Sequence, residues 1–286
     1  MKTITIKWIA IGVVALQLFS CRSDSSSEFK NALTFYVSFD NGTTADYALG
    51  DRDIYTATSG ENLDNIQVGM NNPDHEILKG EGQLGDAFKF GKKSDKFIFY
   101  KSKDNIAYTP QNWSGTVSFW LKLDPATDLE PGYTDPIQIT DTRYNDASIW
   151  VDFTDKNPRD FRLGVIGDID VWSLDTLKSS AEAEFEKRLV RVKELPFTKA
   201  SWTHVLITYH ELGTAQSSAS LYLNGEKMGT ISGIDDPFTW DVEKSNIYIG
   251  LNFTGLMDEL SIFNKPLTDD QVMELYQLEG GIKSIL

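Results

Sequence analysis

Residues 115–123 read GTVSFWLKL, and this stretch decides the fold class. Val117, Phe119, Leu121 and Leu123 occupy every second position, which is the period of a strand with one buried face. The same alternation, bounded by turn residues, recurs on both sides of this stretch. The further predicted strands are residues 33–39, 88–90, 97–100, 148–153, 161–166, 202–209, 220–223, 247–250 and 256–263.

Helical patterns are rare in this sequence. Residues 181–190 are rich in helix-forming Ala and Glu, inside a predicted insertion. Thr268 and Gln271 form a capping box that predicts a short C-terminal helix. Asn224 and Gly225 suit the positive φ angles of a tight hairpin turn. We therefore predict an all-β fold, a two-sheet antiparallel jelly-roll sandwich with a short C-terminal helix and one helical insertion.

The N-terminal segment has the pattern of an export signal. Lys2 and Lys7 precede and flank an apolar run at residues 8–19, which is shorter than the ~20 residues of a membrane-spanning helix. The run ends in LFSC at residues 18–21, which resembles a bacterial lipobox with Cys21 as the lipidated residue. We expect residues 1–20 to be a lipoprotein signal peptide and residues 21–31 to be a lipidated, flexible tether.

Four segments, taken in order, resemble the laminin-G-like branch of the concanavalin A-like lectin/glucanase superfamily. They are VSFDNG at residues 37–42, GTVSFWLK at 115–122, SWTHV at 201–205 with LYLNG at 221–225, and GLMDELSIF at 255–263 followed by Leu267 and Thr268. The resemblance implies one jelly-roll domain over residues 32–280. The tether also resembles those of surface-exposed lipoproteins of the Bacteroidota, which implies a lipid-anchored protein at the outer membrane and cell surface.

The net charge excludes nucleic acid as a partner, and the short motifs of known hydrolases and lyases are incomplete in this sequence. The formal net charge of −15 excludes nucleic acid, which needs a basic surface. The paired acids of jelly-roll glucanases are best approached by DIDVWS at residues 168–173, where Trp172 and Ser173 stand at the positions of the third acid. Related lyases use a Gln-x-His pair, and Gln138-Ile139-Thr140 lacks the histidine. No catalytic signature is therefore predicted.

A carbohydrate-binding surface is predicted from the central strands. Jelly rolls bind sugars with aromatic faces and planar polar side chains. Ile149, Val151 and Phe153 form the apolar side of strand 148–153, so the residues between them point away from the core. The predicted ligand-binding residues are Tyr144, Trp150, Asp152, Arg162 and Trp172. The alternative for the tryptophans is that they support the insertion at residues 175–198.

The family resemblance also implies a structural calcium ion. By position, Asp40 and Asp258 match the residues that hold it, although Asp40 could instead belong to a simple turn. The predicted function is the non-catalytic capture of a polysaccharide or of the glycan of a glycoprotein. Two alternatives remain open at this point: a protein-binding adhesion module, and a divergent glycoside hydrolase or polysaccharide lyase.

Overall fold

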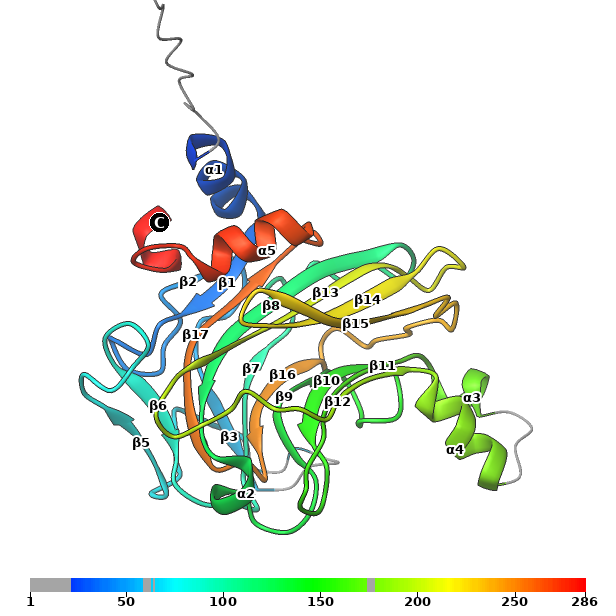
Figure 1. Cartoon of the computed structure of the whole chain (residues 1–286), viewed down its shortest axis with the longest axis horizontal. Helices are drawn as coiled ribbons and strands as arrows, with labels where there is room; N and C mark the ends of the chain where they lie inside the picture. The colour runs from blue at the N-terminus through cyan, green and yellow to red at the C-terminus, as the bar shows by residue number, and fades with distance from the viewer. Residues whose placement is uncertain (1–21, 59–62, 64, 174–177) are drawn as a thin grey trace, which may run out of the picture.

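The computed structural model describes residues 22–58, 63, 65–173 and 178–286. Two antiparallel sheets pack face to face (Figure 1). Within the described residues, sheet A holds nine strands: β1 (Leu33–Val37), β2 (Tyr47–Ala48), β5 (His75–Leu78), β6 (Ala87–Phe90), β8 (Trp113–Lys122), β13 (Thr203–Leu212), β14 (Ser218–Leu223), β15 (Glu226–Ser232) and β17 (Gly255–Phe263). Sheet B holds eight: β3 (Tyr55–Ala57), β4 (Gln67–Val68), β7 (Phe97–Lys101), β9 (Thr134–Thr140), β10 (Ser148–Phe153), β11 (Phe161–Ile166), β12 (Leu189–Val192) and β16 (Asn246–Leu251).

The strand order brings together segments that are distant in sequence. Sheet A runs β15-β14-β13-β8-β17-β1-β2, with β6 beside β17 and β5 beside β6. Sheet B runs β12-β11-β10-β9-β16-β7-β3-β4. The crossovers place β8 beside both β13 and β17, and β9 beside both β10 and β16. The predicted two-sheet jelly-roll sandwich is confirmed.

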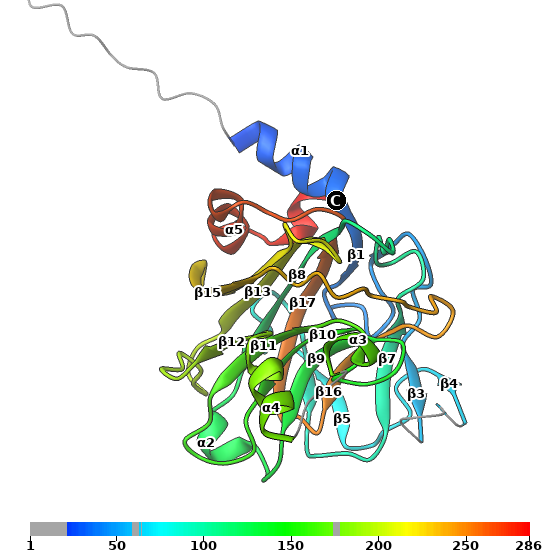
Figure 2. The ribbon, with the colours of Figure 1, turned by 90° about the vertical axis from the view of Figure 1, so that its right-hand side faces the viewer.

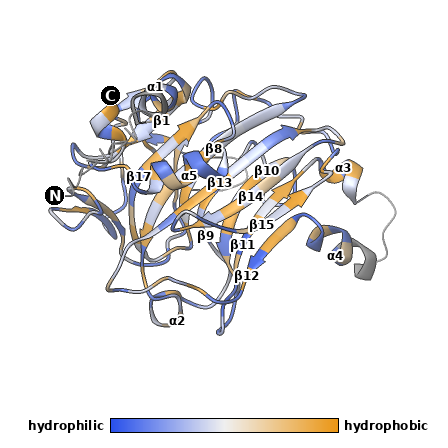
Figure 3. Cartoon of the chain, turned by 45° about the horizontal axis from the view of Figure 1, so that its top comes forward, coloured by the Kyte–Doolittle hydropathy of each residue, from blue (hydrophilic) through white to orange (hydrophobic). Residues whose placement is uncertain are grey.

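The core lies between the two sheets and follows the alternation seen in the sequence. Val117, Phe119 and Leu121 of β8 are fully buried against residues such as Ile149 and Val151 of β10. Hydrophobic residues accordingly run along the strands, whereas the turns are mostly hydrophilic (Figure 3). Burial of this continuous apolar layer is the main force that holds the sheets together.

A second apolar cluster covers the outer face of sheet A. Helix α5 (Asp269–Tyr276) begins at the predicted capping box of Thr268 and Gln271, and its Val272 and Leu275 are buried. The 3₁₀ helix η1 (Ile282–Ile285) and helix α1 (Arg22–Ala32) pack beside it (Figure 2). The remaining short helices are α2 (Pro125–Asp128), α3 (Ile169–Trp172) and α4 (Lys178–Glu186).

The predicted flexible tether at residues 21–31 is wrong for most of its length. Residues 22–32 form α1, and Phe29 is buried with its ring 6.3 Å from that of Phe263. Lys30 Nζ also donates a hydrogen bond to the carbonyl oxygen of Leu286, at 2.6 Å. These contacts with the C-terminal half of the chain stabilise a helix that local composition did not predict. The predicted signal peptide at residues 1–20 and the predicted lipidation site Cys21 lie outside the described residues.

The predicted helix at residues 181–190 is correct in its first part only. Helix α4 ends at Glu186, and residues 189–192 form β12 against β11. Val190 and Val192 are buried in the core between the sheets. This burial outweighs the helix propensity of the residues that precede them. Among the described residues, none of the helices has the length and apolar character needed to cross a bilayer.

Candidate functional site

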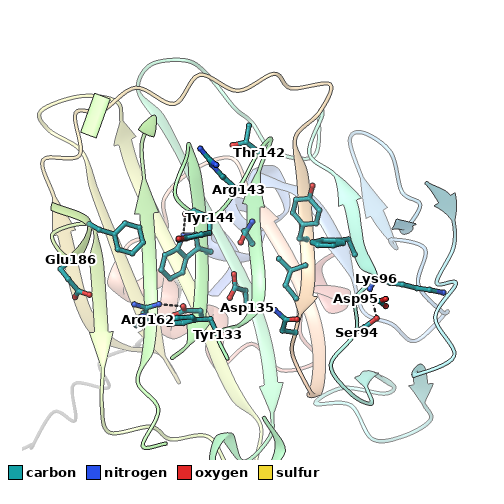
Figure 4. Close-up of a pocket in the computed structure, with 18 of the residues that line it drawn as sticks. Ser94, Asp95, Lys96, Tyr133, Asp135, Thr142, Arg143, Tyr144, Arg162 and Glu186 are labelled. Atoms are coloured by element: carbon teal, nitrogen blue, oxygen red, sulfur yellow. Dashed lines mark hydrogen bonds and ion pairs between the residues drawn. The ribbon is translucent and has the colours of Figure 1, made fainter. Parts of the chain in front are cut away.

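A pocket of about 630 Å³ opens on the outer face of sheet B (Figure 4). Strands β7, β9, β10, β11 and β16 form its floor, the segment before β7 forms one wall, and α4 forms the opposite wall. The lining residues are Ser94, Asp95, Lys96, Phe97, Tyr133, Asp135, Gln138, Thr142, Arg143, Tyr144, Trp150, Asp152, Arg162, Glu182, Phe185, Glu186, Tyr248, Leu251 and Asn252. This volume is within the ~300–1,000 Å³ range of small-molecule sites.

One row of directly opposed residues runs across the outer face of sheet B, and its Tyr248, Gln138 and Trp150 line the floor of the pocket. From strand to strand, Phe99 pairs with Tyr248, Tyr248 with Gln138, Gln138 with Trp150, and Trp150 with Gly164. All of them lie on the face opposite the core, because their neighbours along each strand point inward. The row therefore places the planar amide of Gln138 between the rings of Tyr248 and Trp150, a combination suited to sugar rings and hydroxyls.

Trp150 forms the base of the pocket rather than an exposed platform. Its side chain is 2% exposed, and its Nε1 donates to the carbonyl oxygen of Tyr144 at 2.7 Å. Phe185 of α4 stacks above it, with ring centroids 6.2 Å apart and planes inclined by 24°. The insertion that carries α4 thus covers Trp150 and narrows the pocket.

Gly164 leaves the space that the Trp150 ring fills. A Cβ atom at residue 164 would lie 2.2 Å from Cζ2 of the ring, which is far inside contact distance. We expect Gly164→Ala to lower the free energy of unfolding by about 1–3 kcal/mol, as overpacking does, and to shift the tryptophan fluorescence. Chemical denaturation measures the first effect. Adding Trp150→Phe, with its smaller ring, should restore part of the loss, and an unaltered denaturation midpoint in Gly164→Ala would contradict this packing.

Arg162 and Asp152 form a buried ion pair beside Trp150. Arg162 Nε donates to Asp152 Oδ1 at 2.8 Å and its Nη2 donates to Oδ2, so both carboxylate oxygens are engaged. The guanidinium also lies 5.4 Å from the Trp150 ring centre and 5.0 Å from that of Tyr133. Two hydrogen bonds and two aromatic neighbours hold this pair in a single geometry.

Asp135 is a second carboxyl group on the pocket floor. The register between β9 and β10 shifts between Val151 and Phe153, so Asp135 and Pro136 both lie opposite Asp152. Irregular pairing of this kind re-aims side chains, and it accounts for an acid at a position that strict alternation assigns to the core face. Burial and the nearby Asp152 raise the pKa of Asp135 well above its usual range, against the opposing effect of Arg162.

Two tyrosines stand at the mouth of the pocket. Tyr144 is 53% exposed and Tyr133 is 50% exposed, and both line the pocket (Figure 4). Arg143, next to Tyr144, is also exposed. Exposed aromatic rings beside a cavity are the surfaces on which a sugar ring can stack.

The structure brings together most of the predicted ligand-binding residues. Tyr144, Trp150, Asp152 and Arg162 all line the pocket, which leaves their role in binding a prediction. Trp172 does not line it: its ring packs 5.8 Å from that of Phe185, and its Nε1 donates to the carbonyl oxygen of Asn145. Trp172 therefore supports the wall from behind, as the alternative interpretation of the tryptophans stated.

Sequence reasoning missed several residues of this pocket. They are Tyr133, Asp135 and Gln138 around β9, Phe185 on α4, and Tyr248 on β16. The alternation of Ile137, Gln138 and Ile139 was the available signal for β9, and Pro136 obscured it because proline is rare inside strands. Nothing in the local sequence indicates that Phe185 folds over Trp150.

The two predicted calcium ligands, Asp40 after β1 and Asp258 within β17, both accept hydrogen bonds from the same short loop at residues 84–86. The backbone N–H of Asp86 donates to Asp40 Oδ1 at 2.9 Å, and that of Leu84 donates to Asp258 Oδ2 at 3.0 Å. Lys283 Nζ lies 2.7 Å from the other oxygen of Asp40, and the N–H of Glu259 lies 2.8 Å from that of Asp258. Among the described residues, no three His, Cys, Asp or Glu side chains gather as a metal site. Each of the four carboxylate oxygens thus faces a backbone N–H or the Lys283 ammonium group, so a calcium ion would have to displace some of these donors. The rest of its six to eight ligands would be carbonyl or water oxygens.

Asp258 and the adjacent Glu259 both have pKa values well above those of exposed carboxyl groups. Burial and the adjacent Glu259 raise the pKa of Asp258 to about 8. Burial, Asp40 and Asp46 raise the pKa of Glu259 to about 7, and the hydrogen bond from the Tyr36 hydroxyl opposes the shift. Lys283 is the cation that faces this group from η1.

The two sheets, the capped C-terminal helix and the pocket on the outer face of sheet B define a lectin-like sandwich. The sequence profile of the Laminin_G_3 family, within the concanavalin A-like lectin/glucanases superfamily, matches residues 100–273. The chain belongs to this family. No curated protein matches the sequence.

Solved structures of several binding domains share the fold. Domain 4 of AbnA, a GH43 extracellular arabinanase from Geobacillus stearothermophilus solved in complex with arabinotriose, has a TM-score of 0.52 at 18% identity, covering 86% of this chain and 98% of that one. The binding domain of Paraclostridial Mosquitocidal Protein 1 has a TM-score of 0.52 at 13% identity, covering 87% and 52%. The binding domain of botulinum neurotoxin serotype G has a TM-score of 0.55 at 14% identity, covering 86% and 51%. The chain thus matches about half the length of the toxin domains, and these similarities concern the fold alone.

Proposed function

We propose that the protein is a binding module that captures carbohydrate in the pocket on the outer face of sheet B. The observation that carries this proposal is the composition of the pocket: aromatic rings, a planar amide and a guanidinium surround a cavity large enough for a few sugar units. The arabinanase domain with bound arabinotriose shares the fold, which makes a short neutral oligosaccharide a reasonable first ligand to test.

A glycan array with the purified chain, with and without added calcium, tests the proposal. We expect retention of a restricted set of poly- or oligosaccharides. Retention of none of them, together with binding of a deglycosylated protein partner, would favour the adhesion-module alternative. If no soluble oligosaccharide inhibits the binding of the chain to the array, the retention does not come from a sugar in this pocket, which would contradict the assignment.

Hydrolysis or elimination is the second candidate function, and the meeting of Asp135 with Asp152 on the pocket floor is the observation that favours it. A hydrolase requires both acids of such a pair to reach the glycosidic bond. Asp152 does not meet this requirement, because Arg162 engages both of its oxygens and the pair is buried. The geometry therefore supports binding better than catalysis, and the release of reducing ends from a retained glycan is the result that would reverse this preference.

We also propose that the module is displayed on the cell surface. The signal-like residues 1–20 and the lipobox-like residues 18–21 support lipidation of Cys21, with the lipid in the outer membrane. The net charge of −15 gives the domain no electrostatic attraction to an anionic lipid surface. Metabolic labelling with a palmitate analogue, compared between the natural chain and Cys21→Ser, tests this part of the proposal.

A calcium ion at Asp40 and Asp258 remains a proposal for the same domain. It is supported by the convergence of the two carboxylates on the loop at residues 84–86. We expect calcium to raise the melting temperature and EDTA to lower it, because an ion that binds only the folded state stabilises it. The effect should disappear in Asp40→Asn. An unchanged melting curve, with no metal detected by mass spectrometry, would contradict the site.

A further inference from the structure

The carboxyl groups that line the pocket differ in whether they have a hydrogen-bond or ion-pair partner. Asp152 is bonded by Arg162, and Glu186 at the rim is paired with Arg191. Asp135 has no such partner: within the described part of the chain, no residue donates a hydrogen bond to its carboxyl group or forms an ion pair with it. It nevertheless lines the pocket and is half-buried. A polar group in this position is costly unless a ligand or water bonds to it.

The neighbours of Asp135 determine its charge. Asp152 faces it from β10 and Arg162 from β11, while Leu251 is its partner on β16 and contributes no charge. Because Arg162 is committed to Asp152, the floor already holds one neutralised ion pair. Burial and the Asp152 charge raise the pKa of Asp135, so its carboxyl group keeps a proton at pH values where an exposed aspartate is ionised. A protonated carboxyl group both donates and accepts hydrogen bonds, as a sugar hydroxyl does.

We propose that the floor of the pocket accepts an uncharged sugar unit whose hydroxyl group hydrogen-bonds to the carboxyl group of Asp135. We also propose that it rejects sugars bearing carboxylate or sulfate, because Arg162 is already committed to Asp152 and, among the described residues, no free cation at the floor offsets the desolvation of an added negative charge. This inference rests on the carbohydrate-binding function proposed above and names the ligand class of that site. Asp135 is then a specificity-determining residue. Arg143 and Lys96 lie at the rim, so they do not compensate a negative charge at the floor.

Binding of matched oligosaccharides tests the proposal. The probes are neutral oligosaccharides of two to four units and uronic acid oligomers of the same lengths. We expect the wild-type chain to bind its best neutral probe at least tenfold more tightly than any uronate probe. Asp135→Asn, which retains a donor and an acceptor without charge, should bind the neutral probe within about threefold of wild type. Asp135→Ala should weaken it by up to about tenfold, the effect of losing one hydrogen bond.

The outcomes separate this inference from the proposed function. If the wild-type chain binds no glycan, the proposed function fails and this inference fails with it. If it binds glycans but takes uronates as tightly as neutral sugars, only the inference fails. The inference also fails if Asp135→Asn is as weak as Asp135→Ala, because the ionised form would then be the one that binds. A near-ultraviolet circular dichroism spectrum like that of wild type shows that a variant is folded, so its weaker binding does not come from unfolding.

The pH dependence of stability gives an independent measurement. A carboxyl group whose folded pKa exceeds its unfolded value, about 3.9, destabilises the folded state progressively as the pH rises above that value. At pH 4, the difference in melting temperature between Asp135→Asn and wild type should therefore reflect packing alone. Between pH 5 and pH 8, the melting temperature of Asp135→Asn should rise progressively relative to that of wild type. A constant difference across this range would show that Asp135 is not protonated in the folded protein and would overturn the proposal.

Discussion

Replacement of both Tyr133 and Tyr144 by alanine is expected to abolish oligosaccharide retention while the protein stays folded. Each ring is about half exposed at the pocket mouth, so part of each ring remains accessible to a sugar beside its contact with Arg162 or Phe185. Loss of one aromatic stacking contact costs about 1.4 kcal/mol, or tenfold in the dissociation constant. The two rings are distinct contacts, so the double variant should bind about 100-fold more weakly. Isothermal titration calorimetry or affinity electrophoresis with the best ligand from the array measures this loss.

Matched variants identify the cause of such a loss. Tyr133→Phe with Tyr144→Phe retains both rings and should keep most of the affinity. Leu49→Ala removes an exposed apolar side chain that does not line the pocket, and it should bind as the wild-type chain does. An exposed substitution of this kind changes stability by about 0.5 kcal/mol or less, so the melting temperature of Leu49→Ala should hardly change. Tyr133→Ala also removes the ring beside Arg162, so the melting temperature of the double alanine variant is measured together with its binding. Full retention by the double alanine variant would show that the mouth of this pocket is not the binding surface.

Arg162→Met is expected to have the largest effect on stability. Removing the guanidinium leaves the carboxylate of Asp152 buried and without its partner, next to Asp135. Breaking a buried ion pair in this way costs about 3–5 kcal/mol. The flanking rings of Trp150 and Tyr133 would also lose the cation between them. Urea denaturation followed by tryptophan fluorescence measures the change in the free energy of unfolding.

A double variant distinguishes an unpaired charge from a simple loss of packing. Asp152→Leu combined with Arg162→Met removes both charges and should recover most of the stability, because apolar side chains of similar volume often replace buried ion pairs at little cost. Lys89→Met breaks the exposed pair between Lys89 and Glu76 and should leave the unfolding midpoint nearly unchanged. If Arg162→Met is no less stable than Lys89→Met, the buried Asp152–Arg162 pair does not stabilise the folded protein.

The predicted glycan-contact residues illustrate what alternation reveals and what it leaves open. The parity of strand 148–153 correctly placed Trp150 and Asp152 on the face away from the core. It did not show that Phe185 covers Trp150 or that Arg162 engages both oxygens of Asp152. Of the predicted residues, Tyr144 is the one that stays exposed to a ligand, and the structure adds Tyr133 and Asp135, which the prediction missed.

Local sequence patterns correctly predicted the all-β sandwich, the inward faces of its longer strands, the hairpin turn at Asn224 and the capped helix after Thr268. Each of these depends on residues close in the chain, where the period of two and the capping geometry act directly. Local patterns did not predict the helical state of residues 22–32, the end of α4 at Glu186 or the position of Asp135 on the pocket floor. These features depend on contacts between distant segments: Phe29 with Phe263, β12 with β11, and the shifted register of β9 against β10. Burial and pairing across the fold overrode local preference there, and the shifted register of β9 against β10 is the contact that places Asp135 in the pocket.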